Sequence, residues 1–185
     1  GWAEAAAVLV AAAPAPVPDE DAGGLFRLWP VLTVVERHGV EEPEVSLDAL
    51  EALTQRFTAE FAIRPLIARW EEVALARLEV WARHASPHVR RLVSEGTRPR
   101  LPWGRALRVR DTARVEGLLD ALVDDRSEVV RRSVANHLGD ILKEDRERGL
   151  ALARRWLERD EARRPLVRHG LRAVLKAGDP RALAM

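Results

Sequence analysis

The segment Ser86-Pro87-His88-Val89-Arg90-Arg91-Leu92-Val93-Ser94 recurs 41 residues later as Ser127-Glu128-Val129-Val130-Arg131-Arg132-Ser133-Val134-Ala135. A weaker third copy is Pro165-Leu166-Val167-Arg168-His169-Gly170-Leu171-Arg172. In each copy a serine or a proline can open a helix, a valine can pack inward, and arginine follows. The chain therefore repeats a helical unit.

A period near 40 residues with paired helices is typical of HEAT-like repeats. One helix pair cannot bury its apolar face alone, so neighbouring pairs stack into a curved array. We predict an all-α HEAT-like solenoid that forms a single domain over residues 1–185, with a basic concave face. An unrelated helical bundle is the alternative. Stacking would bring the arginine pairs into register along one face.

The composition supports helices and excludes several classes of protein. The 185 residues are 47% hydrophobic and 32% charged, which fits neither a disordered nor a membrane protein. Tyrosine is absent, and no apolar run approaches the roughly 20 residues that cross a bilayer. The absence of cysteine excludes disulfides and thiolate metal sites, and a reducing cytosol is the simplest setting.

Local patterns predict further helices before the repeated blocks. We expect helices at Trp2–Ala13, at Trp29 or Pro30 to His38 with Gly39 as its cap, and at Leu47–Phe57 with Ser46 as N-cap. A further helix is expected from Thr58 past Glu60, with a bend or a restart near Pro65, and another at Glu71–His84. Pro14, Pro16, Pro18 and Gly23-Gly24 mark a loop. A second loop, between Gly96 and Thr112, is rich in proline and arginine, and loops of this length are usually functional.

Charge is distributed unevenly along the chain. Residues 1–60 carry 11 acids and 3 bases, whereas residues 83–110 carry 8 arginines and one acid. Residues 126–172 carry 13 bases and 8 acids, although the net charge of the whole chain is only +1. A clustered cationic segment is the footprint expected for a polyanion.

Three blocks of the sequence stand together: "EFAIRP" at 60–65, "VRRLVSEGTRPRLPW" at 89–103 and "VRRSVANHLGDI" at 130–141. In their residues, order and spacing they resemble the AlkC branch of the HEAT-like DNA alkylation repair proteins. With the helices between them, the resemblance covers most of residues 25–178. We expect the amino-terminal part of the family to be missing before Gly1, so that the chain is a fragment.

The resemblance implies a monofunctional DNA glycosylase that removes cationic N-alkylated bases, chiefly 3-methyladenine-like lesions, from double-stranded DNA. The family's active-site carboxylates and aromatic residue fall on Glu60, Asp140 and Trp103. Some branches only bind nucleic acid, so a non-catalytic binder of unusual DNA is a second interpretation. A third is a protein-interaction scaffold whose arginines hold an acidic partner.

The residues themselves allow less specific interpretations. Arg132, Asn136 and Asp140 share one helix face, which could be a solvated polar stripe with an Arg–Asp pair. Glu60 could be an acid at a helix N-terminus. The repeat register and the resemblance favour Asp140 as the carboxylate that stabilises positive charge on the sugar and orients water. Glu60 would be a second carboxylate.

Trp103 lies among arginine, proline and glycine, so we expect it to stack on a base or a cationic lesion, whereas Trp70, Trp81 and Trp156 are expected in the core. The arginines predicted to contact phosphates are Arg90, Arg91, Arg98, Arg100, Arg131, Arg132 and Arg168. The alternative is ordinary surface arginine, or salt bridges to Glu95 and Glu128.

No metal or cofactor is expected, because the five histidines lack ligand spacing and no glycine-rich phosphate loop is present. We expect a monomer in the cytoplasm, at the nucleoid. The glycosylase interpretation requires Arg131, Arg132, Asp140 and Trp103 on one wall open to solvent. A buried Asp140 or Trp103 would overturn it.

Overall fold

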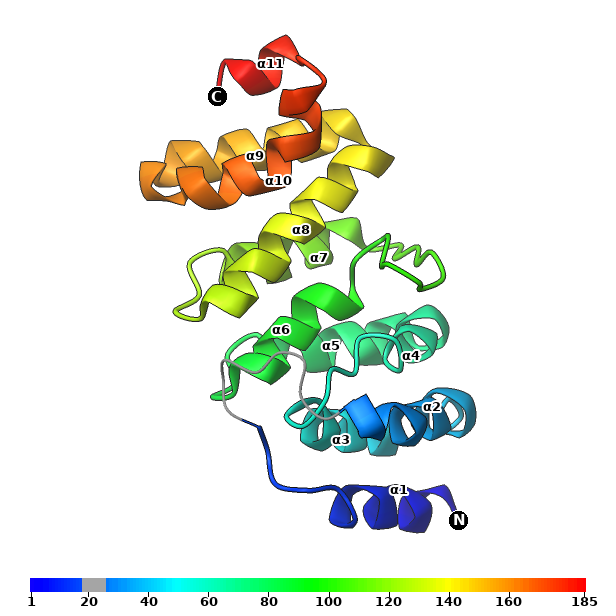
Figure 1. Ribbon diagram of the computed structural model, residues 1–185. Helices are drawn as coiled ribbons and strands as arrows, with labels where there is room; N and C mark the ends of the chain where they lie inside the picture. The colour runs from blue at the N-terminus through cyan, green and yellow to red at the C-terminus, as the bar shows by residue number, and fades with distance from the viewer. Residues whose placement is uncertain (18–25) are drawn as a thin grey trace.

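The computed structural model describes residues 1–17 and 26–185, and in these ranges the chain is all-α, without a strand (Figure 1). The α-helices are α1 (Trp2–Ala11), α2 (Trp29–His38), α3 (Pro43–Thr54), α4 (Arg64–Arg69), α5 (Glu71–Trp81), α6 (Pro87–Gly96), α7 (Thr112–Leu122), α8 (Glu128–Glu144), α9 (Arg146–Arg159), α10 (Arg164–Lys176) and α11 (Pro180–Leu183). Two short 3-10 helices span Phe26–Leu28 and Glu161–Arg163. Pro18 and Gly23-Gly24, predicted to mark a loop, lie outside the described residues.

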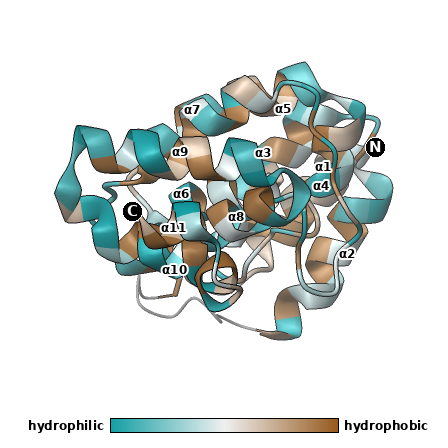
Figure 2. Ribbon diagram, turned by 90° about the horizontal axis from the view of Figure 1, so that it is seen from above, coloured by the Kyte–Doolittle hydropathy of each residue, from teal (hydrophilic) through white to brown (hydrophobic). Residues whose placement is uncertain are grey.

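The helices stack in chain order from α1 at one end to α11 at the other (Figure 1). Helices α6, α8 and α10 contact one another in sequence and form one layer, and α3, α5 and α7 do the same. Seen from above, α7 and α9 lie on one side of the stack, and α8 and α10 lie on the other (Figure 2). The predicted helical-repeat fold is confirmed, whereas its curvature and basic concave face stay predictions.

The repeat register is visible in the core. Val89, Val130 and Val167 occupy equivalent positions in α6, α8 and α10, and each is at most 1% exposed. Each therefore packs inward, as the repeated blocks predicted. Trp81 and Trp156 are also fully buried in the core, and Trp70 packs partly buried against it.

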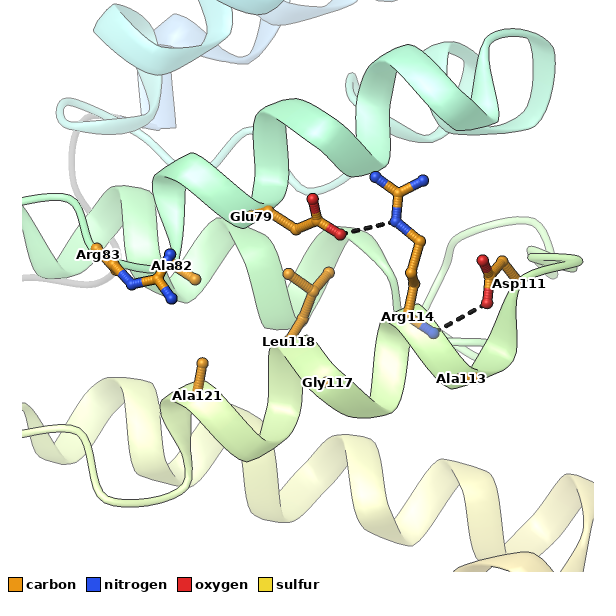
Figure 3. A pocket seen from close by; sticks show the side chains of 9 residues that line it. All are labelled: Glu79, Ala82, Arg83, Asp111, Ala113, Arg114, Gly117, Leu118 and Ala121. Carbon is orange, nitrogen blue, oxygen red and sulfur yellow. Dashed lines mark hydrogen bonds and ion pairs between the residues drawn. The ribbon is translucent and has the colours of Figure 1, made fainter.

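Ion pairs join successive helices of the α5–α7–α9 layer. Arg114 of α7 reaches back to α5, where its Nε donates to Glu79 at 2.7 Å (Figure 3). Its Nη1 donates to Glu72 at 2.8 Å. These bonds raise the pKa of Arg114 although burial opposes its charge. Arg148 of α9 repeats the arrangement one step later, donating to Glu116 of α7 at 2.6 Å. Part of the high arginine content thus stabilises the stack.

Two predicted helix starts are wrong. Helix α3 begins at Pro43, and Ser46 lies inside it, where its hydroxyl donates to the Gly39 carbonyl and accepts from Trp2 Nε1 at 2.8 Å. No helix begins at Thr58, because the chain runs through turns until α4 starts at Arg64.

Among the described residues, no helix is both long and apolar enough to cross a membrane.

Candidate active site and nucleic-acid interface

The predicted carboxylate Glu60 is paired with an arginine of the first repeated block. Glu60 lies in the turn before α4, and its Oε2 is 3.2 Å from Arg91 Nη2 on α6. The Thr58 hydroxyl donates to the same carboxylate and accepts from Arg91 Nη1 at 3.0 Å. Arg91 Nη2 also lies 3.9 Å from Glu95 Oε1. Glu60 is thereby linked to Glu95, a buried carboxylate that was expected from the sequence only as a salt-bridge partner.

The same chain of charges continues from Glu95 to Asp140. Arg98 Nη1 donates to Glu95 Oε2 at 2.8 Å, and its Nε and Nη2 both lie 2.7 Å from Asp140 Oδ2. Lys143 Nζ lies 3.1 Å from Asp140 Oδ1. These residues, here called the carboxylate network, are Glu60, Arg91, Glu95, Arg98, Asp140 and Lys143. The two predicted carboxylates therefore belong to one network, contributed by three parts of the chain.

Asp140 does not face open solvent. Its side chain is 4% exposed, because Arg98 folds back over it from the loop after α6. The prediction that Asp140 lies open on the same wall as Arg132 is therefore wrong. The possible pair between these two residues is also absent, since Arg132 donates to Glu128 at 2.6 Å.

Each carboxylate of the network has a cationic partner, which its burial requires. An unpaired buried charge costs several kcal/mol, roughly 3–5 when one partner of a buried pair is removed. Burial alone would lower the pKa of Arg98, but attraction to Glu95 and Asp140 outweighs it and raises the pKa. Arg98 therefore remains a guanidinium cation between two carboxylates.

Arg64 anchors the loop that follows α6. Its side chain is buried, and among the described residues its hydrogen bonds all go to backbone carbonyls: to those of Arg98 and Arg105, each at 2.7 Å, and to that of Gly96 at 3.3 Å. Burial, and then the nearby Arg98, lower the pKa of Arg64. A guanidinium is suited to this task because its donors form a rigid fork. No local pattern in the sequence indicates this role of Arg64.

The far end of the loop is held by Glu71 at the start of α5. Its carboxylate accepts from the backbone N–H of Arg110 at 3.0 Å and of Asp111 at 2.9 Å. Burial would raise the pKa of Glu71, but these donors outweigh burial and lower it. Leu101 and Leu107 of the loop are buried. The loop that carries Trp103 is therefore tied to α4 and α5 and packed onto the core.

Trp103 projects from this loop into solvent. It is 95% exposed, and its φ of 63° makes it the one non-glycine residue with a positive φ among those described. Such a conformation is strained and is often found at functional sites. Trp103 borders a hollow of about 620 Å³ whose lining includes Trp29 and Phe61, two rings with centroids 5.2 Å apart. The expected exposure of Trp103 is confirmed.

The first arginine of the first two repeated blocks is structural. Arg90 is buried and makes a two-pronged ion pair with Asp125, with nitrogen–oxygen distances of 2.6 and 2.9 Å. It also donates to the carbonyls of His84 and Ala85. Arg131 is half-buried and donates to the Asp125 carbonyl at 2.5 Å. The prediction that Arg90 contacts phosphate is wrong in this structure, and Arg131 is engaged within the protein.

The other arginines predicted to contact phosphate differ in their exposure to solvent and in their ion pairs within the protein. Arg91 and Arg98 belong to the carboxylate network. Arg100 is exposed and pairs with Glu144. Arg132 is 63% exposed, and Arg168 is exposed with no ion pair among the described residues. Arg100, Arg132 and Arg168 are therefore the predicted residues most open to a ligand.

His137 is a buried histidine of α8 that was not singled out from the sequence. Its Nδ1 lies 3.0 Å from the Ser94 carbonyl, which can only accept, so Nδ1 carries the proton. Burial, with the positive charge of Arg98, lowers the pKa of His137 to about 3.

Within the described ranges, no group of three or more His, Asp or Glu side chains is placed to hold a metal ion.

Stacked helix pairs with equivalent inward valines define a HEAT-like helical-repeat protein. No family model matches the sequence. The chain is 41% identical over 153 residues to the uncharacterized protein YhaZ of Bacillus subtilis, a match of 82% of this chain and 43% of that protein.

A solved structure, Pseudomonas fluorescens alkylpurine DNA glycosylase AlkC bound to DNA containing an abasic site analog, matches with a TM-score of 0.87 and 35% identity. That match covers 100% of this chain and 50% of the AlkC chain, so the chain spans about half the length of the proteins it matches. The resemblance predicted from the sequence is confirmed: the chain is an AlkC-type member of the HEAT-like repeat proteins.

Proposed function

We propose that the chain is the glycosylase part of an alkylpurine DNA glycosylase, which hydrolyses the N-glycosidic bond of cationic N-alkylated bases in double-stranded DNA. The observation that carries this proposal is the similarity of the whole chain to AlkC bound to DNA with an abasic site analog. An abasic site is what remains after a glycosylase has acted. The meeting of Glu60 and Asp140 in one network adds support.

Hydrolysis of this bond needs only modest catalysis by the protein. A base alkylated at N3 already carries positive charge, so it leaves without a strong general acid. As the bond breaks, positive charge moves onto the deoxyribose. A carboxylate about 4 Å away stabilises this charge by roughly 4 kcal/mol at an effective dielectric near 20. That corresponds to about a thousandfold in rate.

Asp140 is the proposed carboxylate, and water is the proposed nucleophile, which makes the enzyme monofunctional. In the resting structure, Arg98 and Lys143 cover Asp140. The proposal therefore includes a movement of one of these cations when DNA binds, for example toward a phosphate. Glu60 is the second carboxylate, and Trp103 is free to stack on the lesion.

Release of methylated bases from duplex DNA tests the proposal. The wild-type chain should release 3-methyladenine, and Asp140→Asn should slow release by about a thousandfold. Asp124→Asn is the matched control, because Asp124 is a half-exposed aspartate that pairs with Arg163 away from the network, and its rate should be unchanged. Equal rates for wild type and Asp140→Asn would remove Asp140 from the mechanism.

A non-catalytic DNA-binding protein is the second candidate, and the burial of Asp140 favours it. Such a protein would bind DNA with salt-sensitive affinity but release no base. A scaffold for an acidic protein would show neither property. We further propose that the protein acts as a monomer, in the cytoplasm at the nucleoid.

A further inference from the structure

The three repeat copies place Arg91, Arg132 and His169 at the same position, two residues after the inward valine. Arg91 and Arg132 are permanently charged, whereas a histidine side chain titrates near neutral pH. Helix α10 thus carries a switchable cation where α6 and α8 carry fixed ones. Because α8 and α10 pack directly against each other, His169 lies beside the residues of α8.

Hydrogen bonds fix the ring of His169. Asn136 Oδ1 accepts from Arg172 Nη2 at 3.1 Å and lies 3.1 Å from His169 Nε2. Arginine only donates, so the atom facing it is the amide oxygen, and His169 Nε2 must also donate to that oxygen. A neutral ring therefore leaves Nδ1 without a proton. Protonation adds an N–H at Nδ1, a donor for an anion.

The surroundings of His169 are cationic. Arg132 on α8 and Arg172 on α10 are the charged groups that act on the ring, and after burial they lower the pKa of His169. Helices α9 and α11 and the 3-10 helix Glu161–Arg163 place no ion pair or hydrogen bond on it among the described residues. Arg168 is exposed one residue away.

The arginines of α10 differ from those that bridge the helices of the α5–α7–α9 layer. In the α5–α7–α9 layer, Arg114 and Arg148 are each paired with a carboxylate of the preceding helix. Neither Arg168 nor Arg172 has a carboxylate partner within the described part of the chain. Arg132 does pair with Glu128, but both side chains are exposed, at 63% and 72%, so that solvent screens the pair. Exposed cations with few internal counter-ions are the feature expected of a phosphate site.

We infer that Arg132, Arg168, His169 and Arg172 bind a backbone phosphate of the DNA duplex, and that protonation of His169 strengthens this contact. The inference rests on the proposed function for the identity of the polyanion. A phosphate beside the ring favours its charged form, so binding takes up a proton. DNA affinity should therefore rise as the pH falls from 8 to 5.5.

Binding of a fluorescent duplex with a non-hydrolysable abasic site analogue, titrated over a range of salt concentrations, tests the site. Arg172→Gln should weaken binding about tenfold and reduce the slope of log K against log salt by about one. Arg154→Gln is the matched control, because Arg154 is exposed on α9 and has no ion-pair partner among the described residues. It should change the dissociation constant less than twofold and leave the slope unaltered.

His169→Gln tests the pH dependence, because glutamine can still donate to Asn136 but cannot take up a proton. Wild type should bind about tenfold more tightly at pH 5.5 than at pH 8, and the variant should lose most of this gain. Circular dichroism checks that each variant is folded. Equal effects of Arg172→Gln and Arg154→Gln, or an unchanged pH dependence in His169→Gln, would overturn the inference.

Base release is measured separately on the same proteins. If wild type binds DNA and Arg172→Gln binds weakly while no base is released, the phosphate site stands and the proposed glycosylase activity fails. If base is released and Arg172→Gln binds as tightly as Arg154→Gln, the activity stands and the phosphate site fails. A wild-type chain that binds no duplex DNA contradicts both.

Discussion

Arg98 holds Asp140 through two nitrogens, each 2.7 Å from the same carboxylate oxygen, across 42 residues of sequence. The pair is largely buried, since the two side chains are 11% and 4% exposed. Arg98 also binds Glu95, so one guanidinium serves two carboxylates. The stability of the network should therefore depend on this residue.

Replacing Arg98 by glutamine should lower the free energy of unfolding by about 3 kcal/mol, because two largely buried carboxylates each lose one of their two cationic partners. The double variant Arg98→Gln/Asp140→Asn should lose less than the sum of the single changes, by about 1–3 kcal/mol, since one stranded charge is then removed. Urea denaturation of all four proteins measures the coupling. Additive losses would mean that the pair is not coupled in solution.

Gly170 lets α8 and α10 approach closely. A β-carbon there would lie 2.7 Å from Leu138 Cδ2 and 2.9 Å from the Ala135 carbonyl oxygen. Gly170→Ala should destabilise the protein by about 1–2 kcal/mol, despite the better helix propensity of alanine. The control is Gly117→Ala on α7, where a β-carbon meets nothing within 4 Å and the change should stabilise by about 0.5–1 kcal/mol. Thermal unfolding compares the two, and destabilisation of both would contradict the argument.

His137 should make stability depend on pH. Burial lowers its pKa to about 3 in the folded protein, whereas in the unfolded chain it titrates near 6.5. The unfolded state therefore binds a proton first as the pH falls, and folding loses stability below about pH 6.5. At pH 5.5 the loss relative to pH 7.5 should be about 1.4 kcal/mol from this residue.

Denaturation of His137→Gln at both pH values checks this expectation, since the variant should lose that part of the pH dependence. His84→Gln serves as the comparison, because His84 is half-buried and lies at the protein surface near Glu51. It should retain the full effect of His137. A pH dependence that is the same in His137→Gln and wild type would assign the effect to other groups.

Arg64 should keep the Trp103 loop closed to proteases. Arg64→Lys preserves the charge but loses the fork that reaches three carbonyls, so trypsin should cleave within residues 98–110 at least tenfold faster. Pro65 follows position 64, which spares the substituted residue itself. Arg69→Lys is the control, because Arg69 is an exposed arginine of the same helix, and its loop should be cleaved at the wild-type rate.

Much of the fold could be predicted from the repeated block, because the inward valines recur at positions set by a local pattern. The errors arose where distant residues decide. Ser46 looks like an N-cap, but its hydroxyl is used by Trp2 and Gly39, and Pro43 starts the helix. Pro65 predicts a bend or a restart of the helix, and the restart is what occurs, because Pro65 lies in the first turn of α4.

The sequence predicted which carboxylates belong to the candidate site, but it did not predict how they are arranged or paired. Glu60 and Asp140 were expected to act together, and they do share a network. The two carboxylates are paired with Arg91, Arg98 and Lys143. The pair with Arg98 forms because the loop after α6 folds back onto α8, and no spacing in the sequence predicts the course of this loop. Arg90 and Arg91 look alike in sequence, yet only the position of Asp125 makes the first of them structural.

The carboxylate network contains its own counter-ions, and this reduces the electrostatic potential that the network produces at a distance. Alternating opposite charges a few ångströms apart cancel beyond a Debye length, which is about 8 Å at physiological ionic strength. On the proposed function, the three acids of the network therefore raise no barrier to the approach of DNA. Attraction at long range would come from unpaired guanidinium groups such as those of Arg168 and Arg172, which would set the encounter rate, and the acids would act only at close contact.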